Sequence, residues 1–401
     1  MKRVCGLDVH KETIFCATIK GEKRSPVTEH TTLTPSIRAM GEQLRNEGIE
    51  EIAMESTGIY WVPVWNILEE MGFSLILVNP YLIKQMPGRK SDVKDAQWIA
   101  TLLQKGLLRS SLVPCQNIRE LRTYSRKYIK IQQRQTSVLQ EMERALEMCS
   151  IRITSFVSNL SGKSVYHVIQ QIVQGETSPE IMVKSVHNRI VNAHKKEKIT
   201  ESLTGFITEH HRFMLELLLQ EYEMLIDQSN RCLLKMEELC RNNYPDQLKL
   251  LLTIPGISLI SAMIVIAETG ADMKAFENSG KFSGWTGLRP RNDESAGKFK
   301  STATMKGNRF LRSTLVQVAW ASTHIKGSYF KEKFSRLALR KSRKKALIAI
   351  ARKLSVLIWN VLYYKQVYNP ERAIVYDPAK IHAKMNYHQK EVERLQNLAR
   401  R

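Results

Sequence analysis

Four acidic residues stand where carboxylates can do chemistry together. Asp8 ends the apolar run at 4–8, and Glu55 ends a second short apolar run at 52–55. Asp92 and Asp95 are three residues apart at the predicted start of a helix, so their side chains share one helix face. A charge that closes an apolar strand is costly without a partner, which argues against the alternative that Asp8 and Glu55 are ordinary solvated residues.

Four carboxylates brought together would repel one another unless divalent cations lay between them. Oxygen-only sites suit magnesium or manganese. A pair of such ions serves phosphoryl transfer, one at the attacking oxygen and one at the leaving oxygen. We therefore predict that Asp8, Glu55, Asp92 and Asp95 converge on one Mg²⁺ (or Mn²⁺) site for phosphoryl transfer.

The charge of the chain predicts a polyanionic partner. The 401 residues carry a formal net charge of +22, and the residues from Ala296 onward hold 24 Lys and Arg against 5 Asp and Glu. Contacts between such side chains and phosphates release counterions and supply most non-specific affinity for nucleic acids. Apolar residues interrupt the basic segments at core-like spacing, which favours nucleic acid over a membrane; the alternative is a solvated helix face.

The six cysteines show neither a C-x-x-C pair nor a partnered histidine spacing, so zinc and disulfide frameworks are not expected. The sequence also shows no pattern typical of a signal peptide or of a long apolar span. We expect a cytoplasmic protein with reduced thiols and no membrane partner.

Residues 1–114 must position the four acidic residues. Apolar runs predict strands at 4–8, 14–19, 27–33, 51–56 and 73–78, and helices at 35–46, 60–71 and within 88–106. Strands that alternate with helices predict an α/β domain with a mixed sheet, whose first three strands are antiparallel. In the last helix we expect the carboxylate edge to lie opposite the core face.

The rest of the chain is predicted to be helical. Residues 115–250 form a helical, coiled-coil arm, in which long amphipathic helices near 117–146 and 200–241 run antiparallel and flank an insertion. Residues 251–368 form a mostly helical domain with a polar loop at 292–298 and a helix from Arg309. Its Pro255-Gly256 turn is either a phosphate-binding turn or a plain helix connection. Residues 369–401 are a polar, loosely ordered tail.

With these motifs assembled, the chain resembles the DEDD-type insertion-sequence transposases (the insertion-sequence one-hundred-and-ten type), which work with a bridge RNA. The resemblance covers nearly the full length. In the amino-terminal region it rests on Gly6-Leu7-Asp8, Glu55-Ser56-Thr57-Gly58-Ile59-Tyr60, Val78-Asn79-Pro80 and Lys90-Ser91-Asp92-Val93-Lys94-Asp95-Ala96. In the carboxyl-terminal region it rests on Ile254-Pro255-Gly256-Ile257, Gly287-Leu288-Arg289-Pro290-Arg291, Glu294-Ser295-Ala296-Gly297-Lys298, Lys306-Gly307-Asn308-Arg309-Phe310-Leu311-Arg312, Lys344-Lys345-Ala346 and Ala351-Arg352-Lys353-Leu354.

The resemblance implies an RNase-H-like, RuvC-like first domain whose four acids bind magnesium, and a carboxyl-terminal transposase domain whose nucleophile matches Ser295. It implies a phosphoserine intermediate, a structured bridge RNA as guide, and donor and target DNA as partners. It further implies a homo-oligomer, dimer or tetramer, in which different protomers supply the two halves of the site. Such a protein would work at the bacterial or archaeal nucleoid.

Basic residues near Ser295 and on the later helices are the expected nucleic-acid contacts: Arg289, Arg291, Lys298, Lys300, Lys306, Arg309, Arg312, Lys344, Lys345, Arg352 and Lys353. Two other functions stay open. A RuvC-like, junction-resolving endonuclease would use the four acids with water as nucleophile, so changing Ser295 would scarcely affect it. A non-catalytic RNA- or DNA-binding protein would show no magnesium-dependent cleavage.

Overall fold

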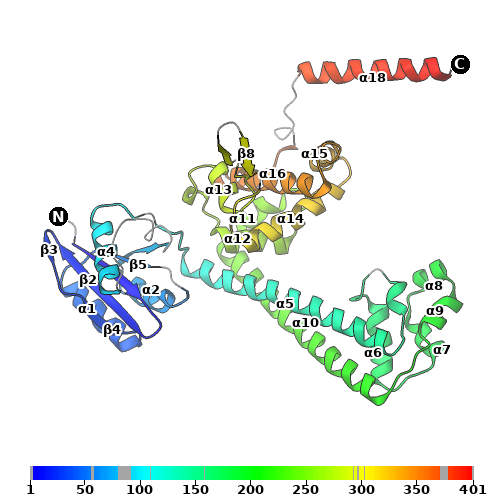
Figure 1. Ribbon diagram of the computed structural model, residues 1–401, viewed down its shortest axis with the longest axis horizontal. Coiled ribbons are helices and arrows are strands. Elements are labelled where there is room, and N and C mark those ends of the chain that lie inside the picture. The colour runs from blue at the N-terminus through cyan, green and yellow to red at the C-terminus, as the bar shows by residue number, and fades with distance from the viewer. Residues whose placement is uncertain are drawn as a thin grey trace. The chain divides into compact units, whose positions relative to one another are not determined.

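The computed structural model places the chain in two compact units, residues 1–114 and 115–401 (Figure 1). It describes residues 3–55, 58–79, 92–108, 110–157, 159–291, 293–295, 298–301, 303–370 and 378–399. Within these ranges the side chains of 92–94, 293–295, 298–300, 378–384 and 398–399 are outside the description.

The first unit is built on a mixed sheet. Its strands are β1 (Arg3–Val9), β2 (Thr13–Lys20), β3 (Lys23–Arg24), β4 (Thr28–Thr31), β5 (Glu51–Glu55) and β6 (Ser74–Val78). They lie in the order β3-β2-β1-β5-β6, with β4 also on β2. The pairs of β2 with β1, β3 and β4 are antiparallel, and those of β5 with β1 and β6 are parallel. The predicted mixed sheet is confirmed.

Helices cover both faces of this sheet. They are α1 (Thr34–Asn46), α2 (Trp61–Glu70) and α4 (Asp92–Gln104). Successive residues of β1 point to opposite faces: Cys5 and Leu7 pack with α1 and α2, whereas Val4 packs with α4. Because both faces are covered, β1 is buried from its second residue onward.

Gly6 sets how closely α4 lies on β1. A Cβ atom at Gly6 would stand 2.4 Å from both the Ala96 oxygen and the Ala100 nitrogen. No real Cβ tolerates such an approach, so only glycine lets the helix backbone rest on the strand. The residue two positions before Asp8 therefore brings the amino-terminal half of α4 to the same end of β1.

The second unit contains two long helices that run antiparallel, α5 (Gln116–Met148) and α10 (Glu209–Asn243). Asn117 donates to Asn243 at 3.0 Å, and Gln132 donates to Ser229 at 2.9 Å. The start of α5 therefore lies beside the end of α10, as in an antiparallel pair. Figure 1 shows the two side by side. The predicted antiparallel pair is present; a coiled coil in the strict sense stays a prediction.

Short helices between α5 and α10 fill the insertion: α6 (Lys163–Val173), α7 (Pro179–Met182), α8 (Asn188–His194) and α9 (Lys196–Ser202). They bury a core of their own against the adjoining halves of the long helices. At the other end, Ile118 and Leu121 of α5 and Met236 and Cys240 of α10 belong to the core of the carboxyl-terminal helices. The ends of α5 and α10 near residues 118 and 240 therefore belong to the core of region 251–368, while the rest of region 115–250 has its own core.

The carboxyl-terminal elements are α11 (Pro245–Leu252), α12 (Leu259–Thr269), α13 (Ser279–Trp285), β7 (Asp293–Ser295), β8 (Lys298–Ser301), α14 (Arg309–His324), α15 (Tyr329–Ala338), α16 (Arg343–Tyr364) and α18 (Pro378–Ala399). The polar loop predicted at 292–298 is wrong, because β7 and β8 pair as antiparallel strands. In the predicted tail, Pro378 stands at the start of α18, and the segment then runs without glycine or proline through good helix formers. That the tail is loosely ordered stays a prediction.

The Pro255-Gly256 turn connects α11 to α12 and packs on α14. Gly256 has a φ of +89°, and a Cβ there would lie 2.8 Å from Ser322 N and Val318 O. Backbone of α14 thus occupies the space that a phosphate would need beside this glycine. Of the two readings of the turn, the structure supports the plain helix connection.

Candidate active site and nucleic-acid interface

Asp8 and Glu55 lie at the same edge of the first unit's sheet. Strands β1 and β5 are parallel, with Leu7 opposite Met54, so each acidic residue follows directly on a paired position. Asp8 is buried, with 8% of its surface exposed, and its Oδ2 lies 3.2 Å from His10 Nε2. The carboxyl ends of adjacent parallel strands are where α/β folds place their ligands.

Asp95 joins this edge from α4. The expectation that the carboxylate side of this helix lies opposite its core face is wrong. Ile99, one turn after Asp95, is fully buried among residues of the sheet, and side chains four apart share a helix face. Asp95 therefore lies on the face turned toward β1.

The electrostatics of Asp8 reflect these neighbours. Burial raises the pKa of the Asp8 carboxyl above its ordinary value, His10 opposes that rise, and the negative charges of Glu55 and Asp95 add to it. The carboxylates of Glu55 and Asp95 are thus close enough to disfavour the charge of Asp8, and a bound cation would relieve that cost.

Asp92 begins α4, but its side chain is outside the described part of the structure. Among the described side chains, no three His, Cys, Asp or Glu residues are grouped as ligands of one ion. A shared metal site of all four acidic residues therefore stays a prediction. What the structure adds is that the charges of Glu55 and Asp95 act on the Asp8 carboxyl.

A basic pocket of about 650 Å³ lies at the amino-terminal end of α14 in the second unit. We call it the α14 pocket. None of its described lining residues carries a carboxylate. The cations that line it are Arg126 of α5, Lys281 of α13, Arg289, Lys306 and Arg309. Three of these five were predicted as nucleic-acid contacts, whereas Arg126 and Lys281 were not.

A ladder of backbone contacts leads from this pocket to Ser295. Met305 N donates to Arg289 O at 3.0 Å, and Arg291 N donates to Ala303 O at 3.0 Å. The strand pair continues as β7 and β8, in which Ser295 is opposite Lys298. Ser295 thus ends β7, directly before residues 296–297. The side chains of Ser295, Lys298 and Lys300 are outside the described residues, so their predicted roles stay predictions.

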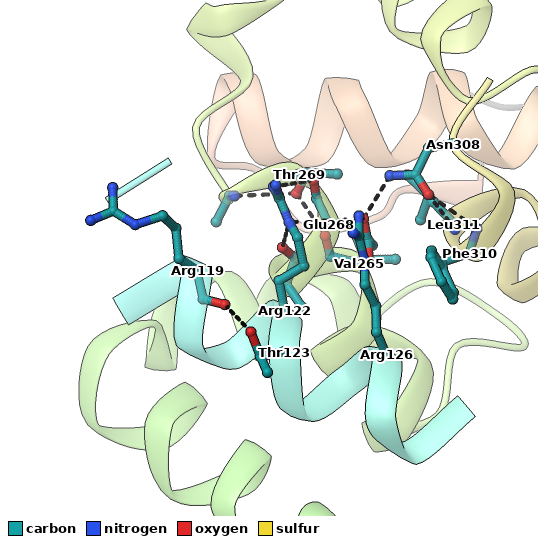
Figure 2. Close-up of polar contacts among 12 residues, drawn as sticks. Arg119, Arg122, Thr123, Arg126, Val265, Glu268, Thr269, Asn308, Phe310 and Leu311 are labelled. Carbon is teal, nitrogen blue, oxygen red and sulfur yellow. Dashed lines mark hydrogen bonds and ion pairs between the residues drawn. The ribbon is translucent and has the colours of Figure 1, made fainter. Parts of the chain in front are cut away.

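A buried carboxylate holds the wall of the α14 pocket (Figure 2). Glu268, fully buried near the end of α12, receives two hydrogen bonds from Arg126: Nε to Oε1 at 2.8 Å and Nη2 to Oε2 at 2.9 Å. Asn308 Nδ2 donates to Oε2 at 2.6 Å. Arg122 donates to the main-chain oxygens of Ala267 and Glu268 at the carboxyl end of the same helix, where cations are favoured.

Asn308 connects that carboxylate to α14. Its Oδ1 accepts from the backbone N–H groups of Phe310 and Leu311, both at 3.1 Å, which caps the helix. The Phe310 ring in turn contacts two guanidinium groups, those of Arg126 at 4.7 Å and Arg309 at 4.8 Å. Helix α14 and two of the pocket's cations are therefore fixed by the same group of contacts.

The remaining predicted contacts differ in setting. Arg312 Nη1 donates to Gly287 O at 2.7 Å, so it ties α14 to the start of the ladder. Four others are exposed on α16: Lys344, Lys345, Arg352 and Lys353. Helix α16 is also the one described helix long and apolar enough to cross a membrane, but half of that stretch is buried, and residues such as Ile350, Leu354 and Ile358 belong to the carboxyl-terminal core.

Sequence reasoning missed Glu268, Arg126 and Lys281. A signal for Glu268 existed, since it is a charge that directly follows the apolar run from Leu259 to Ala267, and such a charge needs a partner when buried. Arg126 carried a weaker signal, because it shares a helix face with Arg122. Nothing in the local sequence distinguishes Lys281 from an exposed lysine.

Two family profiles match the chain. One, described as a transposase of the DEDD, IS110 type, matches residues 5–151, and one described as the transposase IS116/IS110/IS902 family matches residues 248–335. The transposase for insertion sequence element IS1111A of Coxiella burnetii is 32% identical over 120 residues, which cover 29% of this chain and 33% of that protein. A putative transposase, y4pF/y4sB, of Sinorhizobium fredii is 29% identical over 119 residues, 28% of this chain and 30% of that protein.

The chain thus spans about a third of the length of these curated relatives. Among solved structures, Thermus thermophilus RuvC in complex with a Holliday junction substrate aligns with 28% of this chain and 100% of its own, at 16% identity and a TM-score of 0.23.

Proposed function

Because this chain belongs to the IS110-type DEDD transposases, we propose that it cuts and rejoins DNA strands to move an insertion sequence. The observation that supports this most is the sheet edge where Asp8 follows β1 beside Glu55, and where the charges of Glu55 and Asp95 disfavour the charge of Asp8. A fold that brings carboxylates together in this way is one suited to a divalent cation.

The residues present fit Mg²⁺ or Mn²⁺. Asp8, Glu55 and Asp95 offer oxygen ligands, and the negative charges of Glu55 and Asp95 add to the rise that burial causes in the pKa of Asp8. Asp92 would complete the set by family resemblance. When bound, the ion supplies positive charge that polarises a phosphate. His10, 3.2 Å from Asp8, holds that carboxylate in position at the edge.

We propose Ser295 as the nucleophile. Its Oγ would form a bond to a DNA phosphorus while the bond from that phosphorus to a deoxyribose oxygen breaks, and the departing oxygen takes a proton. The phosphoserine keeps the energy of the broken bond for rejoining. The place of Ser295 supports this, since it ends a strand of the ladder that begins at a pocket lined by five cations.

Two further expectations follow from family resemblance. The first is that a structured bridge RNA guides the choice of donor and target DNA. The second is that a dimer or tetramer forms at the nucleoid, in the cytoplasm, with acidic residues and serine from different protomers. Exposed cations on α16 offer both RNA and DNA a surface of the right sign.

The test is to trap the covalent intermediate. Protein purified with its co-expressed RNA would be incubated with Mg²⁺ and a plasmid that carries the element and its flanks, then denatured. Wild type should give a protein–DNA adduct that survives denaturation, and Ser295→Ala should give none. Ser301→Ala, a hydroxyl removed from the paired strand β8, is the matched control and should retain the adduct.

An adduct that persists in Ser295→Ala would place the nucleophile elsewhere. Efficient cleavage by the wild type without any adduct would instead favour the water-using endonuclease. Magnesium-independent binding without cleavage would point to the non-catalytic nucleic-acid-binding protein.

A further inference from the structure

We infer that the α14 pocket binds one backbone phosphate of a nucleic-acid strand, that Arg126 and Lys281 take part in binding it, and that Glu268 is the residue that positions Arg126. The inference rests on the proposed function for its ligand class. It adds two cations, one of them from the arm helix α5, and a buried anion to the contacts expected from the sequence.

Arg126 is presented to the pocket in one orientation. Its Nε and Nη2 groups each donate one hydrogen bond to Glu268, and the Phe310 ring lies 4.7 Å from its guanidinium carbon. A guanidinium has five N–H donors, so others remain, and the side chain is 40% exposed. Because the carboxylate and the ring already fix the side chain, little conformational entropy is lost when a phosphate binds.

The composition of the pocket selects an anion. Five cations converge on it without a carboxylate among the described lining residues, and Gly307 contributes backbone instead of a side chain. Gly307 has no room for one, since a Cβ there would lie 2.3 Å from Gly287 N. The capped amino terminus of α14 adds a favourable dipole for negative charge.

The distance to Ser295 indicates which phosphate is bound. Ser295 is six positions after Arg289, and six residues of extended strand span at most about 20 Å at roughly 3.3 Å per residue. The pocket is therefore suited to a phosphate that flanks the one attacked by Ser295. Lys306 and Arg309, both in the pocket, would then contact this flanking phosphate and not the scissile one.

Binding measurements test the pocket without any need for cleavage. The probe is a fluorescein-labelled DNA duplex, titrated with full-length protein over a range of salt concentrations. Lys281→Gln should weaken binding and lower the slope of log affinity against log salt by about 0.9, as expected for one lost phosphate contact. The matched control is Lys196→Gln, which removes an equally exposed lysine from α9 in the insertion and should leave the slope unchanged.

Glu268→Gln tests the positioning role, because the two explanations predict opposite changes in DNA affinity. Removing a negative charge near bound DNA should strengthen binding if charge alone matters. If Glu268 positions Arg126, binding should weaken instead, in protein whose circular dichroism spectrum matches wild type. Glu277→Gln, which removes an exposed carboxylate 3.9 Å from Lys281, is the control and should not weaken binding.

Each result decides the matter. Equal slopes for Lys281→Gln and Lys196→Gln would refute phosphate binding in the α14 pocket and leave the proposed function intact. Tighter binding by Glu268→Gln would refute the positioning role of Glu268. If Glu268→Gln does not fold, the Lys281→Gln slope still decides the pocket. A wild type that binds no DNA would remove the proposed function, and this inference with it.

Discussion

Two buried carboxylates in this protein have opposite surroundings. Asp8, in the first unit, has Glu55 and Asp95 as neighbours, and burial together with their charges raises its pKa. Glu268, in the second unit, is fully buried but receives hydrogen bonds from Arg126 and Asn308. A buried charge persists only where something neutralises it. At Glu268 the fold supplies the neutralising group, whereas at Asp8 it sets the negative charges of Glu55 and Asp95 against the contact from His10.

The two settings suit a structural carboxylate and a ligand-binding carboxylate, respectively. A carboxylate whose partners are all built into the fold has little left to offer a ligand, so Glu268 acts on its neighbours. A carboxylate whose charge is left unbalanced favours a proton or a cation. The same residue class therefore positions one site and forms another, and the surrounding charges decide which role it takes.

The largest expected effect is on catalysis. Asp8→Asn should lower the rate of strand cleavage by roughly 10⁴-fold, since it removes a cation ligand while keeping the shape of the side chain. Its affinity for DNA should stay near that of wild type, because binding rests on the basic second unit. Single-turnover cleavage at saturating Mg²⁺ measures this, with Glu12→Gln, an exposed carboxylate of the same unit, as control. Normal cleavage by Asp8→Asn would show that Asp8 is not a cation ligand needed for cleavage.

A smaller effect is expected on stability. Glu268→Gln should lower the free energy of unfolding by about 2–3 kcal/mol, because Arg126 loses its counter-charge. The full 3–5 kcal/mol of a completely buried pair is not expected, since Arg126 is 40% exposed. Asp8→Asn, the same chemical change, should be neutral or stabilising when divalent cations are absent. Urea denaturation in EDTA compares the two, and equal losses would contradict the distinction.

The smallest effect is on pH dependence. The folded-state pKa of Asp8 lies above its ordinary value of 3.8, so the native state binds a proton more tightly than the unfolded state. The contribution of Asp8 to the free energy of unfolding is therefore greatest at pH values below 3.8, and it is lost as the pH rises through the pKa of the folded state. Wild type should therefore lose stability relative to Asp8→Asn over this window.

Added MgCl₂ should restore most of that loss in wild type, since a bound cation favours the charged carboxylate, and should leave Asp8→Asn unchanged. Denaturation curves from pH 4 upward, with and without MgCl₂, give the measurement. A wild type that gains stability relative to the variant as pH rises would show that Asp8 is neutralised within the fold, as Glu268 is.

The sequence by itself determined the local elements of this protein and its class. Short apolar runs predicted the strands of the first unit, and three- and four-residue spacing predicted α5, α10 and α14, because such patterns follow from local backbone geometry. The excess of basic residues and the ordered motifs indicated a nucleic-acid enzyme and its family. Secondary structure failed at the β7–β8 pair and at α18, where polar residues were taken as a sign of loop or tail.

Tertiary structure decided which charges meet. Glu268 and Arg126 are 142 positions apart in the sequence, and their pairing depends on how α12 packs against α5. The side of α4 that carries Asp95 was settled by the contact that Gly6 allows with β1. Packing also brought α5, α13 and α14 together around one pocket. Spacing along a chain fixes which side chains share a face, but only packing between elements fixes what that face meets.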